Sequence, residues 1–183
     1  MVVGLGNPGR RYERTRHNLG YAVVAELARR IDVGSPKAKF HGEVAEGSIE
    51  GEKVLLLSPV TYMNRSGMCV QAARGFYGLT DEQLLVVCDD LNLPVAKLRV
   101  RARGSSGGQK GLEDIIRVLQ TEEFPRLRIG IGQPPASWDA ADFVLARFTQ
   151  EELPQIEQAV VKAADAVALW VREGLGACMD RYN

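Results

Sequence analysis

Residues 1–18 read MVVGLGNPGRRYERTRHN and contain glycines at positions 4, 6 and 9 in a G-x-G-x-x-G spacing. In dinucleotide-binding proteins this spacing leads from a strand directly into a helix, whose first amides hold a pyrophosphate. In this chain the residues after the last of these glycines carry no apolar stripe, and helical spacing begins only near Asn18. The stretch therefore disfavours a dinucleotide site. It predicts a strand that ends in a sharp glycine turn and presents Asn7 beside His17.

Strand-like and helix-like segments alternate beyond this stretch. Runs typical of strands cover residues 42–59, 84–90, 96–102 and 126–132, and the first predicts a hairpin that turns near Glu50 and Gly51. Helical spacing covers residues 18–31, 65–78 and 111–119, and a capping-box pattern at 149–152 predicts a long helix that ends near Val171. The alternation predicts a single three-layer α/β/α domain over residues 1–183, with a mixed, mostly parallel twisted sheet.

The composition is that of an ordinary globular protein, with 45% hydrophobic and 25% charged residues. The formal net charge of +0 at pH 7 argues against indiscriminate binding to nucleic acid. Cys69, Cys88 and Cys178 lie in apolar surroundings and are odd in number, which favours reduced thiols and a cytoplasmic protein. No segment resembles a signal peptide or a membrane span, so no membrane partner is expected.

Positive charges gather in residues 97–111, KLRVRARGSSGGQKG, which contain no acidic residue. Because side chains alternate across a strand, the cations at its start project from one face while the residues between them, including Ala102, face the core. We call these cations the basic row; they are Lys97, Arg99, Arg101 and Arg103. A solvated edge is the simpler interpretation, but a row of one sign beside a glycine-rich loop with Lys110 favours contact with phosphates. Arg126 and Arg128, on the next strand-like run, would extend it.

Several other polar residues are candidates for chemistry, and each also has a structural explanation. His17 is one of only two histidines, and a histidine at a helix start more often caps or packs than catalyses. Asp89 and Asp90 end an apolar run, at the edge where open α/β sheets gather ligand chemistry. Adjacent strand residues point to opposite faces, which disfavours a paired-acid mechanism or a two-carboxylate metal cage. Asn64 is explained by a helix N-cap and Asn7 by its turn.

The run GSSGG at residues 104–108 matches the G-x-S-x-G nucleophile elbow, with Ser106 as the nucleophile. In proteins with that elbow the catalytic histidine follows the serine, whereas His17 and His41 both precede it. A serine hydrolase is therefore disfavoured. The spacing of the histidines and cysteines also offers no zinc site.

Six stretches, taken together, resemble the bacterial-type peptidyl-tRNA hydrolases. They run in order from near the first residue to about residue 134 and read VGLGNPG, Y-x-x-TRHN-x-G, P-x-TYMN-x-SG, CDDLNLP-x-x-x-L, GSSGGQKGL and FPRLRIGIG-x-P. The resemblance implies an enzyme that hydrolyses the ester between a peptide, or an N-blocked amino acid, and the terminal ribose of tRNA. It also implies a monomer that uses no cofactor and no metal, with the acceptor end of peptidyl-tRNA as its partner.

The resemblance further implies a role for each matching residue. His17 matches the general base, Asp89 the carboxylate that orients and stabilises it, and Asn7 and Asn64 the polar residues around the scissile bond. Positions that line the substrate cleft are matched by Tyr12, Tyr62, Met63 and Asn64, and by Lys110, where many relatives have asparagine in GGHNG. Positions that meet tRNA phosphates are matched by Arg99, Arg101 and Arg128.

Asn7 beside His17 would allow the enzyme to test for the last amide of the peptide. Aminoacyl-tRNA with a free amine lacks that amide, and a missing partner for a buried polar group discriminates strongly. Two alternatives stay open. A non-catalytic RNA-binding or processing factor on the same scaffold would bind RNA and leave the ester intact, and a small-molecule esterase would cleave simple esters without salt dependence.

Overall fold

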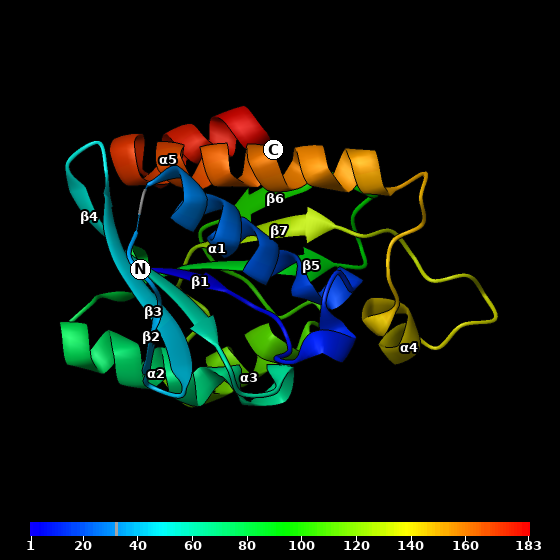
Figure 1. The fold of residues 1–183 in the computed structure, drawn as a ribbon, viewed down its shortest axis with the longest axis horizontal. Helices are drawn as coiled ribbons and strands as arrows, with labels where there is room; N and C mark the ends of the chain where they lie inside the picture. The colour runs from blue at the N-terminus through cyan, green and yellow to red at the C-terminus, as the bar shows by residue number, and fades with distance from the viewer. Residues whose placement is uncertain (32) are drawn as a thin grey trace.

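The computed structural model describes residues 1–31 and 33–183. Within them, the strands form one sheet in the order β2-β3-β4-β1-β5-β7-β6 (Figure 1). The strands are β1 (Val2–Gly4), β2 (Lys37–Lys39), β3 (Gly42–Ile49), β4 (Glu52–Pro59), β5 (Leu85–Asp90), β6 (Leu98–Arg101) and β7 (Arg126–Gly130). At the centre β4, β1, β5 and β7 run parallel, and the β2–β3, β3–β4 and β6–β7 pairs are antiparallel. The predicted mixed sheet is confirmed.

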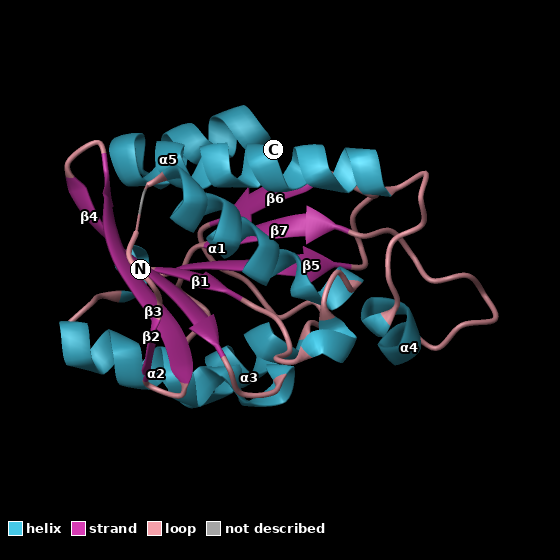
Figure 2. Cartoon of the chain, in the orientation of Figure 1, coloured by secondary structure: helices cyan, strands magenta, loops and turns pink. Residues whose placement is uncertain are grey.

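Helices cover both faces of the sheet and give the three predicted layers (Figure 2). On one face lie α1 (Leu19–Arg30) and α5 (Leu153–Tyr182), and on the other lie α2 (Ser66–Tyr77) and α3 (Lys110–Leu119). The short helix α4 (Ala140–Leu145) lies apart from both layers, beyond the carboxyl ends of β5 and β7 (Figure 1).

Each face of the sheet has its own apolar core. Successive residues of a strand point to opposite faces, so Val2 packs with α1 and α5 while Val3 packs with α2 and α3. β5 is central and covered on both faces, which explains why its sequence is apolar without interruption from Leu85 to Cys88. Asp89 and Asp90 follow at its carboxyl end and are also buried.

The predictions for the β3–β4 turn and for the capping box at 149–152 are confirmed. The β3–β4 turn has left-handed backbone at Glu50 (φ 51°) and Gly51 (φ 92°), as a two-residue hairpin requires. Thr149 and Glu152 exchange hydrogen bonds of 2.7 and 3.3 Å before α5, which forms the predicted capping box.

The final helical segment contains the predicted long helix and a second helix that was not predicted. α5 continues past Val171 to Tyr182, with non-helical backbone at Gly174 (φ 84°). This kink ends the predicted long helix close to Val171, and a second helix folds back along the first, where the Cys178 thiol donates to the Ala166 carbonyl at 3.3 Å. Beyond the kink, Asn183 Oδ1 accepts a 2.8 Å hydrogen bond from the Val100 N–H, so the C-terminal segment protects the edge strand β6.

The glycines of the opening stretch act mainly through packing, which corrects the expectation of a turn alone. Of the three in the G-x-G-x-x-G spacing, only Gly9 has a positive φ, of 101°. Gly4 and Gly20 instead let α1 cross β1 closely. A Cβ at Gly4 would lie 2.2 Å from the Gly20 carbonyl oxygen, and a Cβ at Gly20 would lie 2.2 Å from the Leu5 nitrogen.

The three cysteines are buried and free, as predicted. Burial raises the pKa of Cys69 to about 12 and that of Cys178 to about 11, so these thiols are poor nucleophiles at neutral pH. Among the described residues, no helix is both long and apolar enough to cross a membrane.

Candidate active site

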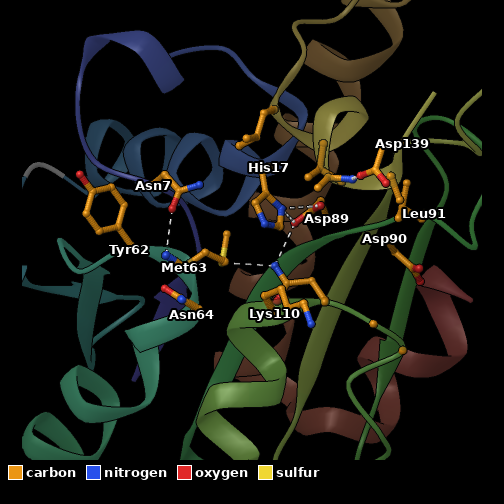
Figure 3. Close-up of a pocket in the computed structure, with 17 residues that line it drawn as sticks. Asn7, His17, Tyr62, Met63, Asn64, Asp89, Asp90, Leu91, Lys110 and Asp139 are labelled. Atoms are coloured by element: carbon orange, nitrogen blue, oxygen red, sulfur yellow. Dashed lines mark hydrogen bonds and ion pairs between the residues drawn. The ribbon is translucent and has the colours of Figure 1, made fainter.

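A cavity of about 540 Å³ opens at the carboxyl end of β5, beside α4 (Figure 3). Its wall is assembled from segments far apart in sequence: the loop after β1, the 3₁₀ turns η2 (Arg16–Asn18) and η3 (Met63–Arg65), the end of β5, and the start of α3. This is the edge of an open α/β sheet at which ligand sites form. The cavity brings together seven of the predicted site residues, namely Asn7, His17, Tyr62, Met63, Asn64, Asp89 and Lys110.

His17 and Asp89 form a buried pair at the centre of the wall (Figure 3). The imidazole Nδ1 lies 2.9 Å from Asp89 Oδ1 and 2.8 Å from Asp89 Oδ2, and the two residues are 7% and 2% exposed. A carboxylate only accepts hydrogen bonds, so Nδ1 carries the proton and Nε2 is left with a lone pair. In the neutral form of His17, this arrangement leaves Nε2 as the nitrogen that can accept a proton.

Asn7 is fixed by bonds at both its backbone and its side chain. Its N–H donates to Asn18 Oδ1 at 2.9 Å, and its carbonyl accepts from Asn18 Nδ2 at 3.0 Å. Asn7 Oδ1 accepts from the Met63 N–H at 2.9 Å (Figure 3). Because the oxygen of the side-chain amide is occupied, its NH₂ group is the part available to a ligand in the cavity.

Arg16 anchors the turn that carries His17, a role that sequence analysis missed. Its guanidinium is buried between the rings of Phe143 and Phe148, at 4.3 and 4.6 Å from their centroids, and binds both oxygens of Glu152 at 2.9 and 2.7 Å. Burial raises the pKa of Glu152, but hydrogen bonds from Arg16 and Thr149 outweigh it, and the net pKa is lowered. This cluster ties η2 to α4 and to the start of α5.

The substrate-cleft residues differ in how firmly they are held. Met63 is buried, whereas Tyr62 and Asn64 are exposed at the rim. Arg65, and not Asn64, precedes α2, so the N-cap explanation of Asn64 is wrong. Lys110 Nζ lies 3.1 Å from Glu113 on the exposed face of α3.

Tyr12 does not line the cavity, in contrast to the implied role. Its hydroxyl accepts a hydrogen bond from Arg11, whose guanidinium also lies over the ring, and its carbonyl accepts from the Thr15 hydroxyl at 2.8 Å. The cavity itself also has an apolar part of its wall, formed by Leu91 and by Ala141, Val144 and Leu145 of α4.

Only Arg99 and Arg101 of the basic row lie on the edge strand β6, so the row matches the expectation in part. Leu98 and Val100 are buried and Arg101 is exposed, as alternation predicts, but β6 ends at Arg101 and Ala102 is exposed. Arg99 stands opposite Arg128 in the β6–β7 register. Arg128 Nε lies 3.0 Å from Asp90 Oδ2, so a buried acid already neutralises this cation.

Arg128 also connects the basic row to the cavity, because its guanidinium lies against Gly107 of the cavity wall. A Cβ at Gly107 would come within 2.2 Å of Arg128 Nη2. Arg126, by contrast, does not extend the row. It is 1% exposed, and its guanidinium donates to the carbonyls of Gly104, Glu122 and Phe124.

Gln109 is a further wall residue that sequence analysis missed. It is 6% exposed and bonds Asp89 from the N-cap position of α3. Nothing in the sequence pattern marked it, because glutamine is not a common N-cap residue. Ser106, the candidate nucleophile of an elbow, is not part of the wall, and its hydroxyl accepts from the Gly108 N–H at 3.3 Å. Within the described residues, no group of three or more His, Cys, Asp or Glu side chains is arranged to hold a metal ion.

The fold and the cavity define an α/β enzyme of the open-sheet class, with its polar residues gathered at the carboxyl ends of the parallel strands. The family model described as peptidyl-tRNA hydrolase matches residues 1–183. The chain belongs to the peptidyl-tRNA hydrolase family, and it is accordingly a hydrolase that acts on an ester bond.

Individual relatives agree over the full length of the chain. It is 54% identical over 183 residues to a peptidyl-tRNA hydrolase of Rhodopirellula baltica, covering 100% of this chain and 96% of the relative. It is 52% identical to one of Chloroflexus aggregans, with coverage of 100% and 98%. A solved structure of peptidyl-tRNA hydrolase from Acinetobacter baumannii superposes with a TM-score of 0.94 at 38% identity, covering 100% of this chain and 93% of that one.

Proposed function

We propose that this chain hydrolyses the ester bond between a peptide, or an N-blocked amino acid, and the terminal ribose of tRNA, which releases the tRNA for reuse. The observation that carries the proposal is the buried His17–Asp89 pair at the cavity, in which no hydrogen bond occupies His17 Nε2 among the described residues. The family supplies the substrate class.

The proposed reaction uses an activated water. His17 Nε2 takes a proton from the water as its oxygen attacks the ester carbonyl carbon, and Asp89 stabilises the imidazolium that forms. The tetrahedral intermediate then collapses, the bond from the carbonyl carbon to the ribose oxygen breaks, and the imidazolium returns the proton to that oxygen. An ester has a good leaving group, so no covalent nucleophile is needed. General-base catalysis of this kind contributes about 10²- to 10⁴-fold in rate.

Two amides complete the proposed site. Asn7 offers its NH₂ group, since its oxygen is held by Met63, and this donor is suited to the carbonyl of the last peptide amide or to the developing oxyanion. Asn64 lines the same cavity from the rim and is proposed to position the water and the ester. Tyr62, Met63 and Lys110 are proposed to contact the substrate, with Lys110 replacing the asparagine of many relatives.

The proposed RNA contacts lie beside the cavity. We propose that Arg99 and Arg101 on β6, together with Arg128 next to Gly107, contact the phosphates of the acceptor end. The protein is proposed to act as a monomer in the cytoplasm, and the buried free cysteines support the cytoplasmic location.

The test is release of N-acetylated amino acid from charged tRNA, measured with the wild-type chain and with His17→Ala. We expect release by the wild type and none above background by the variant. His41→Asn is the matched control, because His41 is exposed and has a left-handed backbone (φ 59°) that asparagine tolerates. Binding of the RNA without release by the wild type would instead favour the non-catalytic factor. Turnover of simple esters that is independent of salt would favour a small-molecule esterase.

A further inference from the structure

Gln109 is a neutral side chain that both caps α3 and hydrogen-bonds the buried carboxylate of Asp89. It precedes α3, is 6% exposed, and uses both ends of its amide. Its Oε1 accepts from the Leu112 N–H at 2.8 Å, while its Nε2 lies 3.0 Å from Asp89 Oδ1 and 3.4 Å from Met63 Sδ. One residue thus joins the helix cap to the carboxylate of the buried pair.

The surroundings determine which way the amide points. The Leu112 N–H is a donor and requires the amide oxygen, whereas a carboxylate and a thioether sulfur are acceptors and require the NH₂ group. A reversed amide would place two donors together on one side and two acceptors together on the other. The orientation with Nε2 toward Asp89 is therefore the one that satisfies every partner.

Asp89 is 2% exposed, so its carboxylate needs hydrogen bonds from the protein in place of water, and the bond from Gln109 is one of them. Among the described side chains, its carboxylate receives hydrogen bonds from His17 and Gln109 only. The His17 Nδ1–H is shared almost equally between the two oxygens, at 2.9 and 2.8 Å, and so leaves the carboxylate poorly defined in rotation. A donor to Oδ1 from a second direction fixes that rotation and stabilises the buried charge.

We propose that Gln109 is a positioning residue for catalysis, which holds the Asp89 carboxylate in the orientation that directs His17 Nε2 into the cavity. This inference rests on the proposed function. Gln109 reaches the reaction only through Asp89, so removal of its donor lowers kcat and leaves KM unchanged. The loss of one hydrogen bond to a charged group corresponds to a decrease of about 10- to 100-fold in kcat.

The variant Gln109→Glu separates positioning from folding. Its carboxyl group keeps an oxygen for the Leu112 N–H and therefore keeps the cap. The titratable groups that face it are Asp89 of β5 and His17 of η2, whereas Lys110 and Glu113 of α3 pair with each other in solvent. Protonated, the new carboxyl donates to Asp89 as the amide does. Ionised, it has lost the donor and repels Asp89.

The experiment measures the steady-state kcat and KM for release of N-acetylated amino acid from tRNA between pH 5 and 9. Thermal unfolding of each variant is measured alongside. For Gln109→Glu we expect nearly wild-type kcat at low pH and a decline of about 10- to 100-fold as the new group ionises, a descending limb that the wild type lacks. For Gln109→Met we expect kcat to be lower than that of the wild type by a similar factor at every pH. Gln83→Glu is the control, because the Gln83 amide also caps a turn, by accepting from the Thr80 N–H at 3.1 Å, but lies outside the cavity wall.

A Gln109→Glu profile that coincides with the wild type would overturn the inference, and so would a loss that is equal at all pH values and follows a lower melting temperature. In either case release by the wild type would leave the proposed function intact. An absence of release by the wild type would contradict the proposed function itself.

Discussion

The cavity wall and the basic row lie side by side, but they are built on opposite physical principles. In the wall, His17, Asp89 and Gln109 are buried and held by hydrogen bonds of 2.8 to 3.0 Å. In the row, Arg101 and Arg103 are exposed, and the Arg103–Glu123 contact is a loose 3.4 Å. The interactions in the wall therefore depend on the geometry of their neighbours and little on ionic strength. The interactions of the row depend on charge and are screened by salt.

This contrast teaches that chemistry and RNA affinity are separable in this molecule. A change of one atom in the wall should affect kcat, whereas a change of one charge in the row should affect binding and its salt dependence. Arg128 is the residue that the two regions share, because it pairs with Asp90 and lies under the Gly107 loop.

The largest expected effect is that of Asp89→Asn. An asparagine can present its NH₂ group to Nδ1, which favours the imidazole tautomer with the proton on Nε2 and removes the general base. We expect kcat to fall about 10²- to 10⁴-fold with little change in affinity for tRNA. Asp90→Asn is the matched control at the next residue, and single-turnover kinetics should show a much smaller loss there. Equal losses in both variants would argue against a specific pair.

The next effect concerns substrate selection by Asn7. Asn7→Ala removes the NH₂ donor. The rate for N-blocked aminoacyl-tRNA divided by the rate for free aminoacyl-tRNA should therefore fall by about 10- to 100-fold. Asn7→Asp retains an acceptor for the Met63 N–H and so tests the donor alone. The measurement compares hydrolysis of both substrates under the same conditions, and a ratio equal to that of the wild type would refute the role of Asn7.

A smaller effect is expected in the basic row. Replacement of Arg99 and Arg101 by glutamine should weaken tRNA binding roughly tenfold at low salt and reduce the slope of log K against log salt by about one to two. Binding titrations between 50 and 300 mM salt measure this slope. Replacement of Arg29, which pairs with Glu26 on α1, is a control that should leave it unchanged. An unaltered slope in the Arg99 and Arg101 variant would place the RNA elsewhere.

The last effect concerns the anchor of the wall and is on stability, with the smallest expected effect on activity. Glu152 has a lowered pKa in the folded protein, so its contribution to the free energy of unfolding is complete above the unfolded pKa, near 4.3, and is lost as the pH falls through the folded value. Glu152→Gln should therefore reduce stability by about 1 to 3 kcal/mol at pH 7 and by much less at pH 3. Urea unfolding at both pH values measures the difference, and a reduction independent of pH would exclude the ion pair as its cause.

Local patterns in the sequence were sufficient for the layers and for most element bounds. The apolar run of β5, the Glu50–Gly51 turn and the 149–152 capping box each act over a few residues, and such signals are legible without tertiary information. The first helix of α5 ends close to the predicted Val171, whereas the second helix after Gly174 was missed because its position depends on packing against the first.

The site was less accessible from the residues alone. His17 and Asp89 are 72 positions apart, and only the family resemblance linked them before the structure did. The roles of Arg16 and Gln109 arise from contacts with Glu152 and Asp89 that no local pattern encodes. Arg126 and Arg128 occupy alternate positions of one strand, yet the first binds buried carbonyls and the second an acid at the cavity.

The most direct test of the central claim measures equilibrium binding and single-turnover hydrolysis of the same N-acetylaminoacyl-tRNA in two variants. For His17→Ala we expect wild-type affinity and no hydrolysis above background. For Arg99→Gln with Arg101→Gln we expect weaker, less salt-dependent binding and a wild-type rate once the substrate is saturating. Hydrolysis that survives in His17→Ala, at a rate near that of the wild type, would contradict the account.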